Sequence, residues 1–232
     1  MVEVRDLTKY YSDVRIINRL YFTIPQNSVS GIIGPNGAGK STLIKIISGF
    51  ENQTSGDVLI NNKIVNDFDD KKKYISYMPE FMLLYPDYFV KEFLDFFHKQ
   101  INYKDDELMD FLGLKSVFDK KISHLSKGWH QRLKLYTSLA MNRDIIILDE
   151  PFDGFDPLQM NDILKIFDLK KDKTFILSIH QLSQAQKICD YFVLLDNGNL
   201  ISYGSIEELK EKFNCSSDLL EDIFIKALKK DG

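Results

Sequence analysis

The chain has 232 residues, of which 44% are hydrophobic and 28% are charged, so it is long enough and apolar enough to bury a sizeable core. Its 30 basic residues against 34 acidic residues give a formal net charge of −4, which argues against a dedicated nucleic-acid-binding protein because there is no overall positive field. The two cysteines, Cys189 and Cys215, form no CxxC pair, so neither a disulfide framework nor a zinc site is indicated and a reducing compartment is expected.

The sequence shows no segment that would direct the chain into or through a membrane. Charged residues at positions 3, 5 and 6 lie where a secretory signal would need an apolar run. No window approaches the ~18 consecutive apolar residues of a spanning helix. If this protein serves a membrane, we therefore expect another chain to cross it, with this chain on the cytoplasmic side.

The first 60 residues read as strands, turns and one helix. Residues 20–24 and 56–60 alternate like half-exposed strands, and residues 29–34 (VSGIIG) form the β-branched apolar run of a buried strand. Residues 35–39 have the composition of a turn, and residues 40–49 have helical spacing with a terminal glycine. The charge cluster at residues 67–73 (DFDDKKK) is expected to be a solvated loop.

From about residue 80 the character changes to helix, with amphipathic stretches at 89–100, 105–112 and 126–142. Residues 144–149 (DIIILD) and 174–179 (TFILSI) then look like buried parallel strands. Residues 192–196 enter a hairpin turn at 197–199, and the tail from residue 206 is helical and charged. This order predicts an α/β core interrupted by a helical insertion of roughly 60 residues.

A phosphate-binding loop lies between the first buried strand and the helix after it. The segment fits the P-loop pattern G-x-x-x-x-G-K-[ST] with Gly34, Pro35, Asn36, Gly37, Ala38, Gly39, Lys40 and Ser41. Glycines let backbone N–H groups converge on phosphate oxygens, and the helix N-terminus adds its dipole. In such loops the lysine reaches the β- and γ-phosphates and the Ser hydroxyl binds Mg²⁺, so ATP and Mg²⁺ are the expected ligands.

A second half of the site follows the strand at 144–149. An apolar strand that ends in Asp149 places a carboxylate at the carboxyl edge of the sheet, where ligands bind in α/β folds. Asp149 is expected to hold Mg²⁺, and Glu150 to orient and deprotonate the attacking water.

At this point the chain resembles the ABC ATPases, the nucleotide-binding domains of ABC transporters, over nearly its whole length and in the family's motif order. Asp156 matches the D-loop aspartate, and His180 matches the switch histidine that contacts the γ-phosphate in the family. Tyr11 matches the aromatic residue that stacks on adenine, with Tyr10 as the fallback. The resemblance assigns ATP binding to Tyr11, Gly34, Asn36, Gly37, Ala38, Gly39, Lys40, Ser41 and Thr42, and catalysis to Glu150, His180 and Lys40.

Residues 125–132 (LSKGWHQR) occupy the place of the family's LSGGQ signature. Ser126 can act as an N-cap, and Gly128 leaves backbone N–H groups accessible to phosphate. In the family this surface, here Ser126, Lys127 and Gly128, contacts the γ-phosphate bound by the opposite subunit. The resemblance therefore implies a dimer, or pairing with a related chain, whose closure is driven by nucleotide binding.

Three residues depart from the family's pattern. Lys127 replaces the first signature glycine, Trp129 replaces a glutamine, and Glu80 stands where the Q-loop normally carries glutamine. Glu80 can still accept from a Mg²⁺-bound water, so it joins Ser41 and Asp149 as an expected metal-site residue. These departures are similar to the sequences of the branch of ABC ATPases that serves drug, antibiotic and ion export. They are expected to affect the hydrolysis rate more than nucleotide binding.

The resemblance implies an α/β P-loop NTPase core, with a mixed sheet and flanking helices, plus an N-terminal antiparallel β portion and an inserted α-helical subdomain. We expect a single ABC ATPase domain over residues 1–232: a catalytic core at 1–79 and 143–210, a helical subdomain at about 80–142 and a helical tail at 211–232. The expected function is to bind and hydrolyse ATP for a separate polytopic membrane subunit, most simply an exporter.

Two other functions remain open at this stage. One is a soluble ABC ATPase acting on ribosomes, DNA repair or iron–sulfur assembly, and the other is a P-loop kinase. The first is disfavoured because the chain holds no second ATPase half, and the second because it leaves the signature, Asp156 and His180 unexplained.

The remaining notable residues have simpler explanations. His98, His124 and His130 show no metal-ligand spacing and are expected to be ordinary polar residues. Trp129 is expected to pack or to lie at an interface. The aromatic segment at 81–97 is expected to be core of the helical subdomain, or in part a groove for a helix of the membrane subunit, around Phe81, Met82 and Tyr85.

Overall fold

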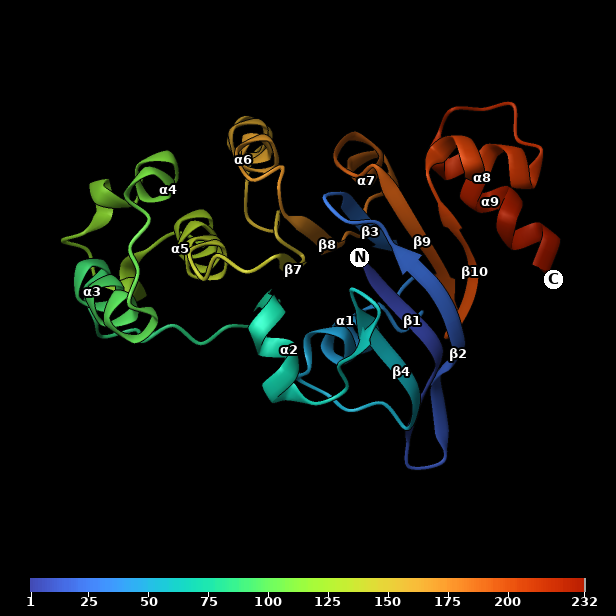
Figure 1. The fold of residues 1–232 in the computed structure, drawn as a ribbon. Helices are drawn as coiled ribbons and strands as arrows, with labels where there is room; N and C mark the ends of the chain where they lie inside the picture. Colours follow the sequence, from blue (N-terminus) through green and yellow to red (C-terminus); the bar gives the residue numbers. More distant parts are fainter. Residues whose placement is uncertain (232) are drawn as a thin grey trace.

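The computed structural model describes residues 1–231, and within them the strands form two sheets (Figure 1). The smaller sheet is antiparallel and joins, in spatial order, β2 (Val14–Ile24), β1 (Val2–Tyr11), β4 (Ser55–Ile60) and β5 (Lys63–Ile64). The larger sheet joins β10 (Asn199–Gly204), β9 (Tyr191–Asp196), β3 (Val29–Ile33), β8 (Thr174–Ser178), β7 (Ile145–Asp149) and β6 (Ile75–Met78). Its strands are parallel except β10, which forms the expected hairpin with β9, so the predicted mixed sheet is confirmed.

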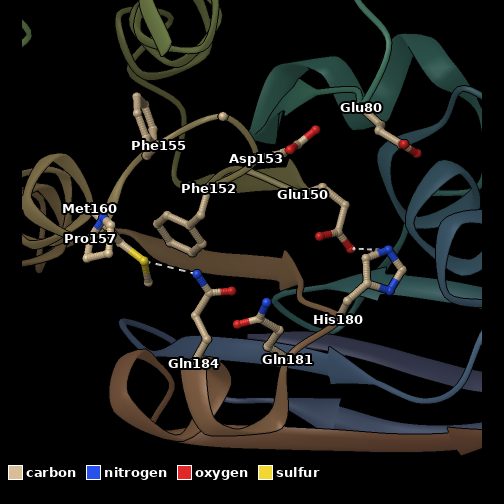
Figure 2. Close-up of a pocket in the computed structure, with 11 residues that line it drawn as sticks. Glu80, Glu150, Phe152, Asp153, Phe155, Pro157, Met160, His180, Gln181 and Gln184 are labelled. Carbon is tan, nitrogen blue, oxygen red and sulfur yellow. Dashed lines mark hydrogen bonds and ion pairs between the residues drawn. The ribbon is translucent and has the colours of Figure 1, made fainter. Parts of the chain in front are cut away.

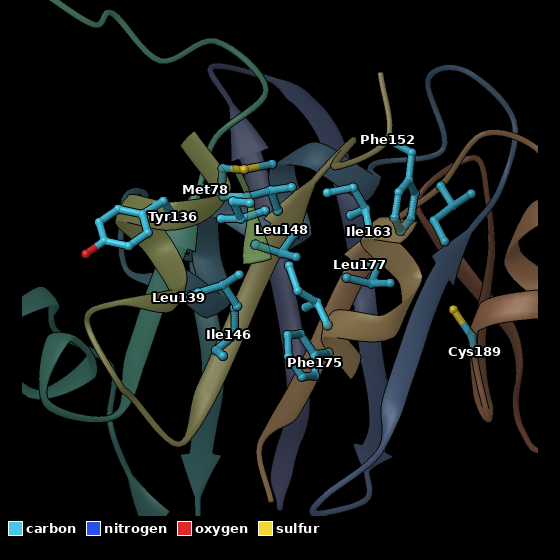
Figure 3. Close-up of a cluster of buried hydrophobic side chains, with 14 of the residues drawn as sticks. Met78, Tyr136, Leu139, Ile146, Leu148, Phe152, Ile163, Phe175, Leu177 and Cys189 are labelled. Carbon is cyan, nitrogen blue, oxygen red and sulfur yellow. The ribbon is translucent and has the colours of Figure 1, made fainter. Parts of the chain in front are cut away.

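The central strands of the larger sheet are buried on both faces, as their continuous apolar sequences predict. In β7, Ile145 and Ile147 belong to one hydrophobic cluster, whereas Ile146 and Leu148 belong to the other. The first cluster fills the space between this sheet, the antiparallel sheet and α1 (Lys40–Ser48). The second, shown in Figure 3, lies under the helices on the opposite face. The β7 strand is therefore fixed from two sides, and with it the position of the residues that follow it.

A group of helices is inserted between β6 and β7, and Figure 1 shows it in green on the side of the larger sheet where β7 lies. It contains α3 (Val90–Ile101), α4 (Asp106–Phe111), the 3₁₀ turns η1 (Leu114–Val117) and η2 (Ile122–His124), and α5 (Lys127–Leu139). Its buried residues, among them Phe93, Leu112 and Tyr136, share one cluster with the face of the larger sheet. The amphipathic stretches expected at 89–100, 105–112 and 126–142 thus all form helices.

Four helices that follow β7 in the chain cover the same face of the larger sheet as the inserted helices. They are α6 (Pro157–Leu169), α7 (Leu182–Ile188), α8 (Ile206–Phe213) and α9 (Leu220–Asp231). The last two pack on each other and on β10, with Leu209 and Ile223 fully buried between them. Helices α8 and α9 therefore lie against the β10 edge of the sheet, on the opposite side from the inserted helices (Figure 1).

The expectation of a solvated loop at residues 67–73 is wrong, because this segment contains the helix α2 (Phe68–Tyr74). Asp67 caps the helix, accepting a hydrogen bond from the backbone N–H of Asp70. Acidic residues occupy its first turn and lysines its last, which complements the helix dipole. One of these lysines, Lys71, is fully buried, so the charge cluster is not simply a solvated surface.

Within residues 1–231, every helix is too short or too polar to cross a lipid bilayer.

Candidate functional site

The carboxyl ends of three neighbouring strands meet at one edge of the larger sheet. β3, β8 and β7 lie side by side and run parallel, so the loops that follow them emerge together. The first loop is the P-loop at residues 34–41, the second leads to His180, and the third begins with Asp149 and Glu150. Topology alone thus brings the predicted phosphate-binding and catalytic residues to one place.

The P-loop has backbone conformations that only small residues allow. Gly37 and Gly39 have φ angles of 83° and 95°, in the left-handed region that favours glycine. A Cβ atom at Gly34 would lie 2.4 Å from the carbonyl oxygen of Leu195, so no larger residue fits there. Gly37, by contrast, faces open space. Helix α1 begins at Lys40 with Gly39 as its N-cap and no side-chain cap, which leaves its first N–H groups for a ligand. This cradle fits a polyphosphate.

The Lys40 side chain folds back over the loop. Its ammonium group donates hydrogen bonds to the carbonyl oxygens of Gly34, at 2.8 Å, and Pro35, at 3.1 Å. Burial lowers the pKa of Lys40, and the nearby carboxyl groups of Glu150 and Asp149 partly oppose that shift. The cation therefore stands within the P-loop and close to both acids, where phosphate oxygens could take the place of the loop carbonyls.

Asp149 is buried at the end of β7, and the register pairs it with Ser178 on β8. The Ser178 hydroxyl donates to Oδ1 of Asp149 at 2.5 Å, and the Ser178 hydroxyl oxygen accepts the backbone N–H of Glu150 at 2.9 Å. The Tyr77 hydroxyl lies 3.5 Å from the other oxygen of Asp149, at the limit of a hydrogen bond. Burial raises the pKa of Tyr77, so it remains a neutral donor. This network fixes the rotamer of Asp149.

Figure 2 shows Glu150 and His180 pointing toward each other across a cleft. His180 Nε2 lies 3.1 Å from Oε1 of Glu150, whose side chain is 17% exposed. Burial, followed by the charge of Asp149, raises the pKa of Glu150 to about 7, while Ser178 and Lys40 act in the opposite direction. A carboxyl group with this pKa is suited to accept a proton near neutral pH.

The cleft itself has a volume of about 630 Å³ and brings Glu80 to the same place as Glu150 and His180 (Figure 2). Glu80 is exposed just beyond β6, and its charge contributes to the raised pKa of Glu150. Ser41 lies in the first turn of α1. Hydroxyl and carboxylate oxygens are the donors that Mg²⁺ prefers, and it usually takes only one or two carboxylates from the protein, so Ser41, Asp149 and Glu80 fit this ion.

Tyr11 ends β1, with its ring partly exposed. Its hydroxyl donates to Oε2 of Glu51 at 2.5 Å, and the ammonium group of Lys9 lies 4.9 Å from the ring centroid. Burial, then Glu51, raises the pKa of Tyr11, and a hydrogen bond with Thr42 of the P-loop helix acts the other way. The Tyr11 ring is thus held beside the start of α1, at one end of the cradle.

The signature residues stand at the N-terminus of α5 and contact the segment that leads into α6. Ser126 occupies the N-cap position, but within the described chain its hydroxyl makes no capping hydrogen bond, so the capping expectation is met in position only. Lys127 Nζ lies 2.6 Å from Oδ1 of Asp153. Gly128 packs against the carbonyl oxygen of Gly154, because a Cβ there would lie only 3.3 Å from it.

Asp156 caps helix α6, accepting hydrogen bonds from the backbone N–H groups of Leu158 and Gln159 at 3.0 and 2.8 Å. Trp129 packs against the hydrophobic core, and Arg132 lies 5.5 Å from its ring. His98 pairs with the hydroxyl of Tyr136 at 2.6 Å. Across residues 1–231, no cluster of three or more His, Cys, Asp or Glu residues could hold a metal by itself.

Two residues of the site had no predicted role. Ser178 joins Asp149 to the backbone of Glu150, and Gln131 of α5 donates to the carbonyl oxygen of Glu150 at 3.0 Å. Both lie inside segments that sequence reasoning did identify, the strand before His180 and the signature helix. A buried polar residue in an apolar strand was the available signal for Ser178, whereas the partner of Gln131 depends on tertiary packing.

Comparison with known proteins identifies the family of the chain. The profile of the family described as "ABC transporter" matches residues 17–153. An uncharacterized ABC transporter ATP-binding protein of Methanocaldococcus jannaschii is 35% identical over 91% of this chain and 80% of its own length. A zinc import ATP-binding protein of Rickettsia conorii is 32% identical over 94% of this chain and 92% of its own length.

Among solved structures, an ATP-binding subunit of an ABC transporter superposes with a TM-score of 0.88 at 27% identity, and the match covers 98% of this chain and 99% of that one. The predicted fold class is therefore confirmed, and ATP is the ligand of the family. The profile match, the two relatives and the superposition agree that the chain belongs to the ABC transporter family, as an ATP-binding subunit of the ABC ATPases.

Proposed function

We propose that this chain binds and hydrolyses ATP with Mg²⁺ and thereby powers a membrane transporter. The observation that carries the proposal is the 3.1 Å approach of Glu150 and His180 at the sheet edge that also holds the P-loop. A base, its histidine partner and a phosphate cradle converge there with the chemistry that ATP hydrolysis needs.

Binding is assigned to residues that surround the cradle. Lys40 and the backbone of Gly34, Asn36, Gly37, Ala38 and Gly39 hold the phosphates, Thr42 contributes from α1, and the Tyr11 ring stacks on adenine. Ser41, Asp149 and Glu80 hold Mg²⁺ directly or through water. When bound, this ion neutralises charge on the phosphates.

Hydrolysis is assigned to Glu150. Its carboxylate accepts the proton of the attacking water, and its raised pKa makes that transfer favourable near neutral pH. His180 holds the carboxylate at one oxygen and faces the cleft from the end of β8. Lys40 stabilises the charge that develops on the transferred group.

Two chains complete each site in this proposal. Ser126, Lys127 and Gly128 present the N-terminus of α5, and Asp156 the N-terminus of α6, to the nucleotide and P-loop of a partner chain. ATP bound between the chains closes the pair, and hydrolysis reopens it. The partner is a second copy or a related ATPase subunit, and no nucleic acid takes part. The division into a core at 1–79 and 143–210, a helical subdomain at about 80–142 and a tail at 211–232 belongs to this proposal.

A polytopic membrane subunit is proposed to dock beside Glu80. Phe81 and Leu83 are 87% and 99% exposed, which is costly for large apolar side chains unless a partner covers them. They line a small apolar depression with Met82 and Leu84. Through this contact the chain lies on the cytoplasmic face of the membrane. We propose export because the signature residues and Glu80 resemble those of exporter ATPases. Family membership alone does not fix the direction of transport, since one relative is a zinc import ATP-binding protein.

Co-purification tests the proposal directly. A tagged Glu150→Gln variant, extracted from native membranes in mild detergent with ATP and Mg²⁺, is expected to bring down a polytopic membrane protein at comparable stoichiometry. Recovery of soluble partners alone would instead support an ABC ATPase acting on a cytosolic assembly. In the same assay Leu83→Asp should lose the membrane partner, whereas Leu219→Asp, a matched change of an exposed leucine in the tail, should keep it.

A further inference from the structure

The backbone of Glu150 has an unusual conformation. Its φ angle is 49°, in the left-handed region that residues with a Cβ rarely occupy. Such a conformation persists only where neighbouring groups hold it, and it is commonly found at functional sites. Because the strand ends one residue earlier, this turn decides where the Glu150 carboxyl group points.

Two side chains form hydrogen bonds with the backbone of Glu150, one with its N–H group and one with its carbonyl oxygen. The Ser178 hydroxyl accepts the backbone N–H of Glu150 at 2.9 Å, and Gln131 donates from Nε2 to its carbonyl oxygen at 3.0 Å. Ser178 is itself fixed by Asp149. The two partners come from different elements, β8 in the sheet and α5 in the inserted helices.

Gln131 is buried, with only 4% of its surface exposed. A buried amide needs a hydrogen-bonding partner, and within the described chain the bond to Glu150 is the one that its side chain makes. It lies on the same helix as Ser126, Lys127 and Gly128, one turn further along. Through the Gln131 side chain, helix α5 therefore contacts Glu150, the proposed catalytic base of the same chain.

We propose that Gln131 is a positioning residue for Glu150. This inference rests on the proposed function, in which Glu150 is the base and the start of α5 contacts the partner's nucleotide. Gln131 and Ser178 hold the backbone of Glu150 in its left-handed turn, so that the carboxyl group meets His180. A displacement of α5 on contact with the partner's nucleotide then reaches the base through the Gln131 hydrogen bond.

Two substitutions test this role on the full chain. Gln131→Met keeps the length of the side chain and removes the donor, so kcat should fall by about tenfold or more, because small misplacements of a catalytic group are costly. The Kd for ATP and the ATP-driven pairing of chains in a Glu150→Gln background should change by less than about twofold. Gln186→Met is the control, because Gln186 also donates to a backbone carbonyl, that of Asp218 at 2.7 Å, and is not among the residues that line the cleft.

Gln131→Glu adds a readout that a purely structural role would not move. The introduced carboxyl group can donate to the Glu150 carbonyl only when it is protonated. The ratio of kcat for Gln131→Glu to kcat for the parent chain, measured at each pH, should therefore rise as the pH falls. The same ratio for Gln131→Met should not change with pH.

Several results would overturn the role. One is a kcat within about twofold of the parent for both variants, and another is an equal loss of kcat and ATP affinity. If Gln131→Met fails to fold, the pH dependence of the Gln131→Glu ratio decides, and failure of both to fold would make Gln131 a stability residue only. A parent chain whose turnover is unaffected by Glu150→Gln would instead refute the proposed function itself.

Discussion

His180 Nε2 lies 3.1 Å from Oε1 of Glu150, although the two residues follow different strands. The register of β7 and β8 explains this approach, because it pairs Asp149 with Ser178 and so brings the residues after them to the same edge. The contact is an ion pair only if the imidazole is protonated and the carboxyl group is ionised. The ionisation of Glu150, whose pKa is raised by burial, should therefore control the activity of the chain.

The pH dependence of turnover follows from Glu150. Because burial raises its pKa from 4.5 to about 7, the carboxylate that accepts a proton is lost as the pH falls through about 7. We expect kcat for ATP hydrolysis to rise with pH through that region and then level off. Glu150→Gln should lower kcat by about 100-fold or more and should remove the rise of kcat with pH. Steady-state hydrolysis at pH 5.5–9 measures this, with ATP saturation checked at each pH. A flat profile in the parent would show that another group is the base.

Tyr11 should govern affinity for the nucleotide rather than turnover. Stacking of an aromatic ring on a base contributes about 1–3 kcal/mol, so Tyr11→Ala should weaken ATP binding by about tenfold. Tyr11→Phe keeps the ring and should stay within about twofold of the parent, although it loses the bond to Glu51. Tyr10→Ala is the matched control, since Tyr10 is similarly exposed on the same strand. Equilibrium binding of a fluorescent ATP analogue distinguishes the two, and a larger effect at Tyr10 would shift the assignment by one residue.

The core of the site was predictable because its geometry is encoded locally. A glycine-rich loop between a buried strand and a helix fixes the phosphate cradle, and two acids after an apolar strand must lie at the sheet edge. What could not be predicted depends on tertiary contacts. Gln131 and Glu150 are distant in sequence, and only the packing of the inserted helices brings them together. The prediction of a solvated loop at residues 67–73 is wrong for the same reason. A run of charged residues gives no sign that Lys71 is buried against α1.

Lys71 should destabilise the fold at neutral pH. Its side chain is fully buried and donates to the carbonyl oxygen of Ile46 at 2.6 Å, and burial lowers its pKa from 10.5 to about 8, with Asp67 partly opposing the shift. Between these values the unfolded chain binds more protons than the folded chain, so the contribution of this residue to stability rises with pH from about 8 to 10.5 and is least favourable below 8.

Replacing this lysine by an apolar residue of similar length should therefore help the fold. We expect Lys71→Met to raise the free energy of unfolding by about 2 kcal/mol at pH 7, with the gain shrinking toward pH 10. Lys72→Met, which changes an exposed lysine of the same helix, should alter stability by less than about 0.5 kcal/mol. Urea unfolding at several pH values provides the comparison. A destabilised Lys71→Met chain would mean that the bond to Ile46 outweighs the cost of burying the amine.

Lys127 should act on pairing rather than on stability. Its ion pair with Asp153 joins two largely exposed side chains, so it contributes no more than about 1 kcal/mol to folding. A lysine in the first turn also opposes the dipole of α5, so it is unfavourable for the stability of the helix but suits a surface that contacts a phosphate.

In a Glu150→Gln background, Lys127→Glu should therefore remain folded and lose ATP-driven dimerisation, because the new charge faces both Asp153 and the partner's nucleotide. Lys121→Glu, a change of an exposed lysine in the same group of helices, should still dimerise. Light scattering with and without ATP measures both, and undiminished pairing of the Lys127→Glu chain would place the start of α5 outside the interface.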